Sequence, residues 1–117
     1  MASHNNTGRV GEILAAEFLT QNGFFLLAAN WRHGHLEVDL IASKDKILHF
    51  VEVKTRSSHL FGPPELKVDH RKLEKLKAAA SEYLHQFPQW LHIQFDVVGV
   101  VVHPGKTAEI YIIEDFF

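Results

Sequence analysis

The sequence contains no cysteine and no long apolar run, and neither sign of charge dominates it. Without cysteine, a disulfide scaffold and a thiolate metal site are excluded, and a cytoplasmic location is expected. The apolar runs fall far short of the roughly 20 residues that cross a bilayer, so no membrane partner is expected. The net charge of −2 means that the chain as a whole is not a polycation.

The first seven residues, MASHNNT, also lack the apolar segment of a signal peptide. We therefore expect residues 1–7 to form a flexible tail and residues 8–117 to form a single domain. A chain of 117 residues with 46% hydrophobic and 22% charged residues has the length and composition to bury one core.

Hydrophobic periodicity and turn residues predict two helices and five strands. The helices span 8–23, with Gly23 as the C-terminal cap, and 69–87. The strands span 24–31, 36–43, 47–56, 92–102 and 108–116, and a Gly-Pro-Pro loop spans 57–67. The order α-β-β-β-α-β-β predicts a fold of the broad α/β class, more narrowly α+β, in which helices flank one mixed sheet.

The stretch HFVEVKTR, from His49 to Arg56, places charged side chains on a strand that begins as core. Side chains of a strand alternate between its two faces. One face carries Leu48, Phe50, Glu52, Lys54 and Arg56, and the other carries Val51, Val53 and Thr55. An acid beside a base on such a strand indicates more than a packing role.

The preceding strand, LEVDLIA, brings a second acid to the same place. Alternation puts Glu37, Asp39 and Ile41 on one face and Leu36, Val38 and Leu40 on the other. A two-residue turn at Asp45-Lys46 would set Asp39 opposite Glu52, whereas a turn one residue earlier would set Glu37 opposite Glu52. Either register places two carboxylates side by side, which is destabilising unless a divalent cation such as Mg²⁺ lies between them. The hairpin therefore predicts a metal site with Lys54 beside it.

A third acid, Glu12, lies on the first predicted helix, on the packing side between Ala16 and Leu19. A carboxylate there is costly unless it is paired or bound to a metal. The alternative is a partly exposed glutamate in the first turns, where the helix dipole favours negative charge.

Basic residues gather between Lys54 and Lys77, where seven of them stand against three acidic ones, a local charge of +4. Such asymmetry permits an anionic partner on one face. A solvated lysine-rich helix face is the alternative.

Together these segments resemble a known family. Asp39 and the Glu52-Val53-Lys54 run are similar to the signature of the PD-(D/E)xK nuclease superfamily. The ordered blocks GRVGEILAAEFL, NWR, EVDLIA, FVEVKTR, FGPPE, HRKLEKLKAAASEYL and FDVV resemble the YraN family. These are small bacterial proteins of unassigned role, similar in fold to archaeal Holliday-junction resolvases. The resemblance runs from Gly8 to Val100.

The resemblance implies a restriction-endonuclease-like fold and metal-assisted phosphodiester hydrolysis. Glu12, Asp39 and Glu52 fall on the positions that bind the metal, Mg²⁺ or Mn²⁺. Lys54 falls on the position that assists the attacking water and completes the implied catalytic set. Glu37 is a candidate accessory acid. The family usually has Gly-Glu-Ile-Asp where this chain has Leu-Glu-Val-Asp at 36–39, a departure that bears on the placement of Glu37.

The implied partner is nucleic acid, with DNA favoured over RNA. Four basic residues would hold its backbone without reading sequence: Arg56, Arg71, Lys72 and Lys75. A homodimer is compatible with the sequence. The rival function, from another class, is a non-catalytic nucleic-acid-binding or assembly module that keeps the nuclease fold.

Three other features carry alternatives. His33, His35 and Glu37 stand at every second position, a spacing that a zinc site can use, although nine histidines make coincidence common. Asp96 is an acid inside an apolar strand, for which a basic structural partner is favoured over a metal. The apolar pair Phe116-Phe117 can pack on the core or on another subunit.

Overall fold

The computed structural model describes residues 2–57 and 70–116, with side chains from Gly8 onward. Its elements are α1 (Ala2–Gln21), β1 (Phe25–His33), β2 (Leu36–Lys44), β3 (Ile47–Ser57), α2 (His70–Gln86), β4 (His92–Val102) and β5 (Glu109–Ile113). The predicted order α-β-β-β-α-β-β is confirmed. Most of the predicted loop over 57–67, and Phe117, lie outside the described residues.

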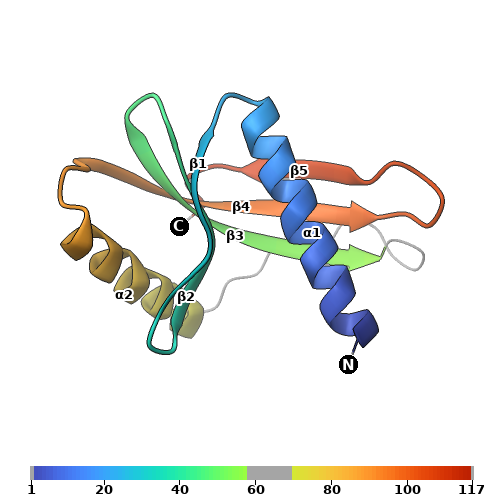
Figure 1. Ribbon diagram of the computed structural model, residues 1–117, viewed down its shortest axis with the longest axis horizontal. Coiled ribbons are helices and arrows are strands. Elements are labelled where there is room, and N and C mark those ends of the chain that lie inside the picture. Colours follow the sequence, from blue (N-terminus) through green and yellow to red (C-terminus); the bar gives the residue numbers. More distant parts are fainter. Residues whose placement is uncertain (1, 58–69, 117) are drawn as a thin grey trace.

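The five strands form one mixed sheet in the order β1-β2-β3-β4-β5 (Figure 1). Neighbouring strands are antiparallel except β3 and β4, which are parallel. Parallel neighbours need a long crossover connection, and the chain between β3 and β4 contains α2. The crossover carries α2 onto one face of the sheet, where it packs against β2 and β1.

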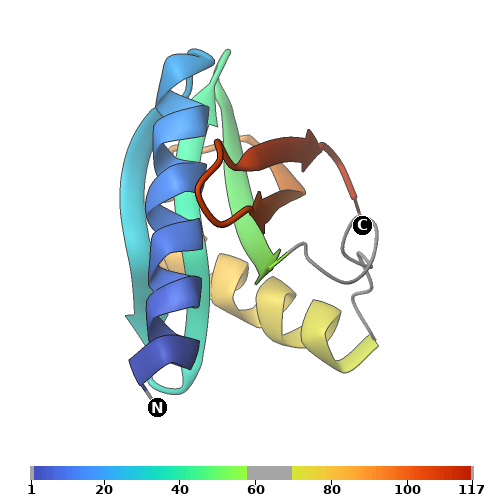
Figure 2. The ribbon, with the colours of Figure 1, turned by 90° about the vertical axis from the view of Figure 1, so that its right-hand side faces the viewer.

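The two helices cover opposite faces of the sheet, and each face has its own core. Ala15 and Leu19 of α1 pack with Leu40, Val51 and Val98. Figure 1 shows α1 lying obliquely across β3, β4 and β5, and Figure 2 shows the same helix from the side. On the other face, α2 contributes Leu76, Ala79, Ala80 and Tyr83, which pack on Ile41, Leu48 and Phe50.

None of the helices in the described part of the chain has the length and apolarity to span a membrane.

The first helix has the predicted end but an earlier start. Gly23 has φ +88° and follows the last turn, where Phe24 N–H donates to Leu19 C=O at 3.0 Å and Gly23 N–H donates to Thr20 C=O at 3.3 Å. This is the Schellman pattern of a glycine cap. The helical backbone begins at Ala2, not at Gly8, so residues 2–7 continue the helix where the sequence predicts a tail. No proline stands in this segment to end a helix.

The β2–β3 hairpin has the first of the two predicted registers. Asp45 and Lys46 both have positive φ, 53° and 67°, as a two-residue type I′ turn requires. Lys44 pairs with Ile47, and the ladder continues to the pair Leu40 and Val51. Beyond that pair no ladder partners are assigned among the described residues, so the two strands part next to Asp39 and Glu52.

The predicted alternation along β2 is wrong at Asp39. Val38 and Ile41 both pack in the cluster under α2, whereas Leu40 packs in the cluster under α1. The neighbouring strand kinks at the same level, because Asn30 has φ 53° and the β1–β2 register omits Asn30 and Asp39. Asp39 therefore sits at a break in the sheet, not in a regular strand.

Candidate functional site

A cavity of about 370 Å³ lies between the β2–β3 strands and α2. Its lining combines acids from the sheet with bases from the helix: His35, Leu36, Glu37, Asp39, Glu52, Arg71, Lys72, Lys75 and Leu76. The predicted acids Asp39 and Glu52 thus share one cavity. Both acids lie where the β2–β3 ladder ends, beyond the pair Leu40 and Val51.

Where the β2–β3 ladder ends, the side chain of Asp39 takes the place of a backbone acceptor for β3. Its Oδ2 atom accepts a hydrogen bond from Val53 N–H at 2.8 Å. Burial, followed by the charges of Glu52 and Glu12, raises the pKa of Asp39 from 3.8 to about 7, against the lowering effects of Val53 N–H and Lys72. This raised pKa is the behaviour of a carboxyl group that is buried and also lies beside other acids.

Glu52 is held by two ammonium groups. Its Oε2 atom forms an ion pair with Lys72 on α2 and lies 3.8 Å from the Nζ atom of Lys54 on its own strand. The Lys54 side chain is not among the residues that line the cavity in the described part of the chain. The sequence predicts Lys54 as the lysine of the site, and the structure adds Lys72 to it.

Glu12 approaches from α1, and a glycine makes that approach close. Gly11 lies so near β3 that a Cβ atom on it would come within 1.8 Å of the Thr55 Oγ1 atom. The next residue, Glu12, is half-buried, and its charge is felt at Asp39. Glu12 does not line the described cavity, so it acts on Asp39 as a nearby charge and not as part of the same cavity wall.

The helix wall of the cavity is cationic. Arg71, Lys72 and Lys75 all line it, so three of the four predicted nucleic-acid contacts face the acids. Arg56, the fourth, does not line it; the side chain is half-buried, with its Nε atom buried. Burial raises the pKa of Tyr111 while the Arg56 charge lowers it, which places Arg56 near β5 and away from the helix wall.

The zinc alternative on β1 and β2 finds no support in the described residues. His33 forms an ion pair with Glu82 on α2 at 3.3 Å, and Glu37 pairs with Arg32 at 3.5 Å. His33, His35 and Glu37 do not bring three ligand atoms within 4.8 Å of one another. Glu37 is nevertheless at the cavity rim, as an exposed acid.

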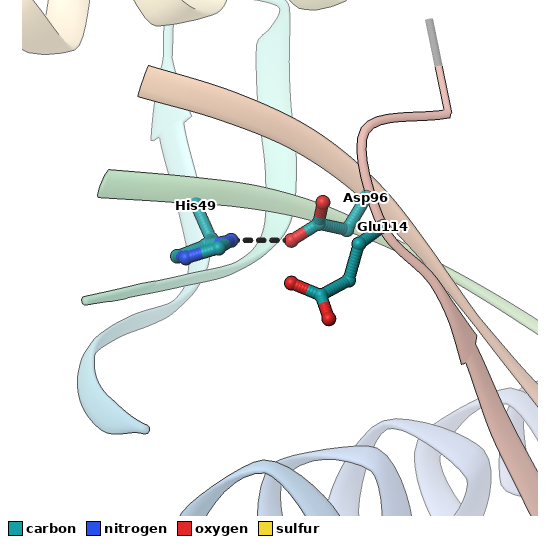
Figure 3. Close-up of side chains that lie close together, drawn as sticks. All are labelled: His49, Asp96 and Glu114. Atoms are coloured by element: carbon teal, nitrogen blue, oxygen red, sulfur yellow. Dashed lines mark hydrogen bonds and ion pairs between the residues drawn. The ribbon is translucent and has the colours of Figure 1, made fainter. Parts of the chain in front are cut away.

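Glu12, Asp39 and Glu52 do not converge to that distance either. Within the described ranges, the one group of three that does is His49, Asp96 and Glu114 (Figure 3). The three acids predicted to bind the metal therefore do not form a ready ligand cluster, and Glu52 forms an ion pair with Lys72 instead.

The buried Asp96 has the basic partner that its position favours. His49 Nδ1 lies 2.6 Å from Asp96 Oδ2, and both side chains are almost fully buried. The other oxygen, Oδ1, accepts from the Gln94 amide at 3.0 Å and from Asp115 N–H at 2.8 Å. Figure 3 shows the His49 ring directed at Asp96 with the exposed Glu114 beside it. These hydrogen bonds satisfy both carboxylate oxygens, so the group ties the end of the chain to β4.

The sequence does not predict the ion pair of Lys72 with Glu52 or the contact of His49 with Asp96. It predicts Lys72 only as one of four nucleic-acid contacts. The His49 to Asp96 contact depends on the parallel β3–β4 register, which pairs Val51 with Asp96 and which no short turn specifies.

Comparison with known proteins gives a consistent family relationship. A model of the uncharacterised protein family UPF0102 matches residues 11–100. A UPF0102 protein of Flavobacterium psychrophilum is 44% identical over 117 residues, covering 100% of this chain and 98% of the relative. A UPF0102 protein of Bacteroides thetaiotaomicron is 38% identical, covering 100% of this chain and 97% of the relative. One of Syntrophomonas wolfei is 44% identical, covering 93% and 96%.

Proposed function

The chain belongs to the uncharacterised protein family UPF0102, as its resemblance to the YraN family predicted, and we propose that it hydrolyses nucleic-acid phosphodiester bonds with a divalent metal ion. One observation supports this proposal above the others. Asp39 and Glu52 on the sheet wall of the cavity face Arg71, Lys72 and Lys75 on its helix wall. The acids can bind a metal ion and the bases can bind a phosphate group, and metal-dependent cleavage of a phosphodiester needs both at one place.

The residues present fit Mg²⁺ or Mn²⁺. The donors are carboxylate oxygens, which these hard cations prefer, and they line a cavity with room for water. The raised pKa of Asp39, about 7, has a cause that a bound cation would offset, namely burial beside the Glu52 charge. A bound ion would supply Lewis-acid polarisation of the phosphoryl group and a lowered pKa for water.

The chain's own residues divide the remaining tasks. Asp39 and Glu52 would hold the ion, and Glu12 would add negative charge from the α1 side. Lys54, 3.8 Å from Glu52, orients the attacking water or stabilises charge on the phosphate. Arg71 and Lys75 hold the backbone phosphates, a contact that carries no sequence information. We expect DNA as the substrate and the cytoplasm as the setting.

A cleavage assay over branched, single-stranded and duplex DNA and RNA, with Mg²⁺, Mn²⁺ or EDTA, tests the proposal. Wild type should cleave at least one substrate with metal and none in EDTA. Asp39→Asn and Glu52→Gln should each abolish cleavage. Glu109→Gln, an exposed acid on β5 outside the cavity lining, is the control and should retain cleavage. Metal-independent cleavage, or cleavage that survives Asp39→Asn, would contradict the assignment.

The non-catalytic module remains the second candidate because one observation favours it. Glu52 is already paired with Lys72 and Lys54, as a purely structural acid would be. Under this alternative, millimolar Mn²⁺ leaves the melting temperature unchanged and Glu52→Gln melts lower than wild type. Under the nuclease proposal, Mn²⁺ raises the melting temperature of wild type but not of Glu52→Gln, because a ligand stabilises the state that binds it.

A further inference from the structure

Lys72 on α2 lies against Glu52 on β3, and the two side chains form an ion pair across the cavity. Lys54 approaches the same Oε2 atom to 3.8 Å. One carboxylate oxygen therefore faces two ammonium groups, one from its own strand and one from the opposite wall. The helix lysine has the closer contact of the two.

Glu52 needs positive charge when no metal is bound. Its side chain is only 12% exposed, and a desolvated carboxylate is costly without a compensating cation. Burial lowers the pKa of Lys72, but its hydrogen bond with Glu52 and the Glu52 charge raise it, and the net direction is upward. The ammonium of Lys72 is therefore charged while it holds Glu52.

A divalent cation would need the same oxygen. A divalent cation on this oxygen would repel the ammonium groups already there, and Lys72, in the closer contact, would be repelled most strongly. Lys72 has the means to leave, because its side chain is 48% exposed and carries a flexible four-carbon stem. Arg71 and Lys75 line the same cavity, so a released ammonium would join a cationic wall.

We propose that Lys72 is an internal counter-ion of Glu52, that a divalent cation displaces it, and that the displaced ammonium then binds a backbone phosphate. The inference rests on the proposed function, since it takes Glu52 as a metal ligand. It makes metal and nucleic acid cooperative ligands. Metal frees Lys72 for phosphate, and phosphate draws Lys72 away from Glu52, so each ligand raises the affinity for the other by the same factor.

Mn²⁺ binding to the full-length, metal-free protein tests the displacement without relying on catalysis. Electron paramagnetic resonance of free Mn²⁺ gives the dissociation constant directly. Lys72→Met keeps a long side chain but removes the competing charge, so Mn²⁺ affinity should rise by about tenfold, within the usual range of such couplings. Lys75→Met is the matched control, from the same helix and cavity, without an ion pair to Glu52 in the described structure. It should change Mn²⁺ affinity much less.

Two further measurements locate the effect. In a Glu52→Gln background, where Mn²⁺ binding is expected to be lost, Lys72→Met should restore none of it, because the contact being cut is already lost. Mn²⁺ should strengthen binding of a DNA duplex to wild type more than to Lys72→Met. Lys72→Gln, a second variant without the charge, should behave like Lys72→Met.

The failures of the two proposals are separable. Wild-type Mn²⁺ binding that is lost in Asp39→Asn, yet not tightened by Lys72→Met or Lys72→Gln, would overturn the counter-ion role and leave the metal site standing. Absence of Mn²⁺ binding in every variant would overturn both. Binding by Lys72→Met alone would support the inference in its strongest form.

Discussion

Asp39 lies in surroundings that disfavour its charge. Burial, the largest cause, and the neighbouring Glu52 raise its pKa from 3.8 to about 7. In the unfolded chain the pKa returns to the ordinary value, so the folded protein binds this proton more tightly than the unfolded chain does. The contribution of Asp39 to stability is therefore fully present below about pH 4 and is lost as the pH rises through about 7.

Asp39→Asn should remove this penalty while keeping an oxygen for Val53 N–H. In EDTA at pH 8 the variant should melt at a higher temperature than wild type, and the difference should shrink toward zero near pH 4. Each pKa unit corresponds to about 1.4 kcal/mol, so the effect at pH 8 is large enough for thermal melts to resolve. Glu37→Gln, an exposed acid on the same strand, should show no comparable gain. A variant that melts below wild type at pH 8 would contradict the electrostatic origin.

Asp96 differs from Asp39 because both of its carboxylate oxygens accept hydrogen bonds. It accepts from His49, Gln94 and Asp115 N–H in a fully buried position. Asp96→Ala removes the acceptor for all three groups in a buried position, and should cost about 3–5 kcal/mol, as removing one side of a buried pair does. Urea unfolding measures this cost. The exposed Glu114→Gln should change stability by no more than about 0.5 kcal/mol. A loss of stability in EDTA that persists in the Glu52→Gln variant would instead indicate an ion held at this group.

Among whole elements, the contact of α1 with β3 depends on one glycine. A Cβ atom on Gly11 would meet Thr55 Oγ1 at 1.8 Å and Thr55 Cβ at 2.7 Å, so a side chain there must push the helix from the strand. Gly11→Ala should destabilise the protein by about 1–3 kcal/mol, the usual cost of overpacking. It should also move Glu12 away from Asp39 and weaken Mn²⁺ binding.

Gly8 supplies the control on the same helix, because a Cβ atom there meets nothing within 4 Å. Gly8→Ala should leave the contact intact and stabilise the helix by up to about 1 kcal/mol. Denaturant melts of both variants check the pair. Equal effects of the two substitutions would mean that helix propensity, not the close approach to Thr55, sets the outcome.

The elements differ in how far the sequence predicts them. The β2–β3 hairpin is local, and a turn at Asp45-Lys46 is enough to set Asp39 opposite Glu52 in sequence register. The break at Asp39 is not local, because it accompanies the kink at Asn30 in the neighbouring strand. Strict alternation therefore predicts the acids at the right place but misplaces Val38.

The sequence pattern does not predict the contacts of α2 either, because they also depend on packing between distant elements. Periodicity predicts an apolar stripe of Leu73, Leu76, Ala80 and Leu84, whereas the fully buried positions are Leu76, Ala79, Ala80 and Tyr83. Which helix lysine reaches Glu52 depends on the rotation of α2 over the sheet. The sequence predicts a basic helix near the acids, and only the fold selects Lys72.

For the whole molecule, a net charge of −2 makes nucleic-acid binding depend on where the charges lie. The crossover from β3 to β4 sets α2 over the acids, so its basic residues form one wall of a cavity and are not spread over the surface. Binding through such a wall uses phosphates and not base edges. It should be weak, indifferent to sequence and strongly dependent on salt.

The salt dependence can be assigned to this wall by a comparison at constant net charge. Arg71→Gln with Lys75→Gln should lower the slope of log K against log salt for duplex DNA by about 1.8, close to 0.9 for each lost phosphate contact. Lys46→Gln with Lys106→Gln removes the same charge from exposed turns outside the cavity lining and should leave the slope nearly unchanged. Fluorescence anisotropy over a salt series in EDTA measures both slopes without cleavage. If the two double variants lose slope equally, general electrostatic attraction carries the binding and the cavity has no special part in it. If only the α2 pair loses slope, DNA lies against the wall that faces Asp39 and Glu52, which is where a cleaved phosphate would have to be.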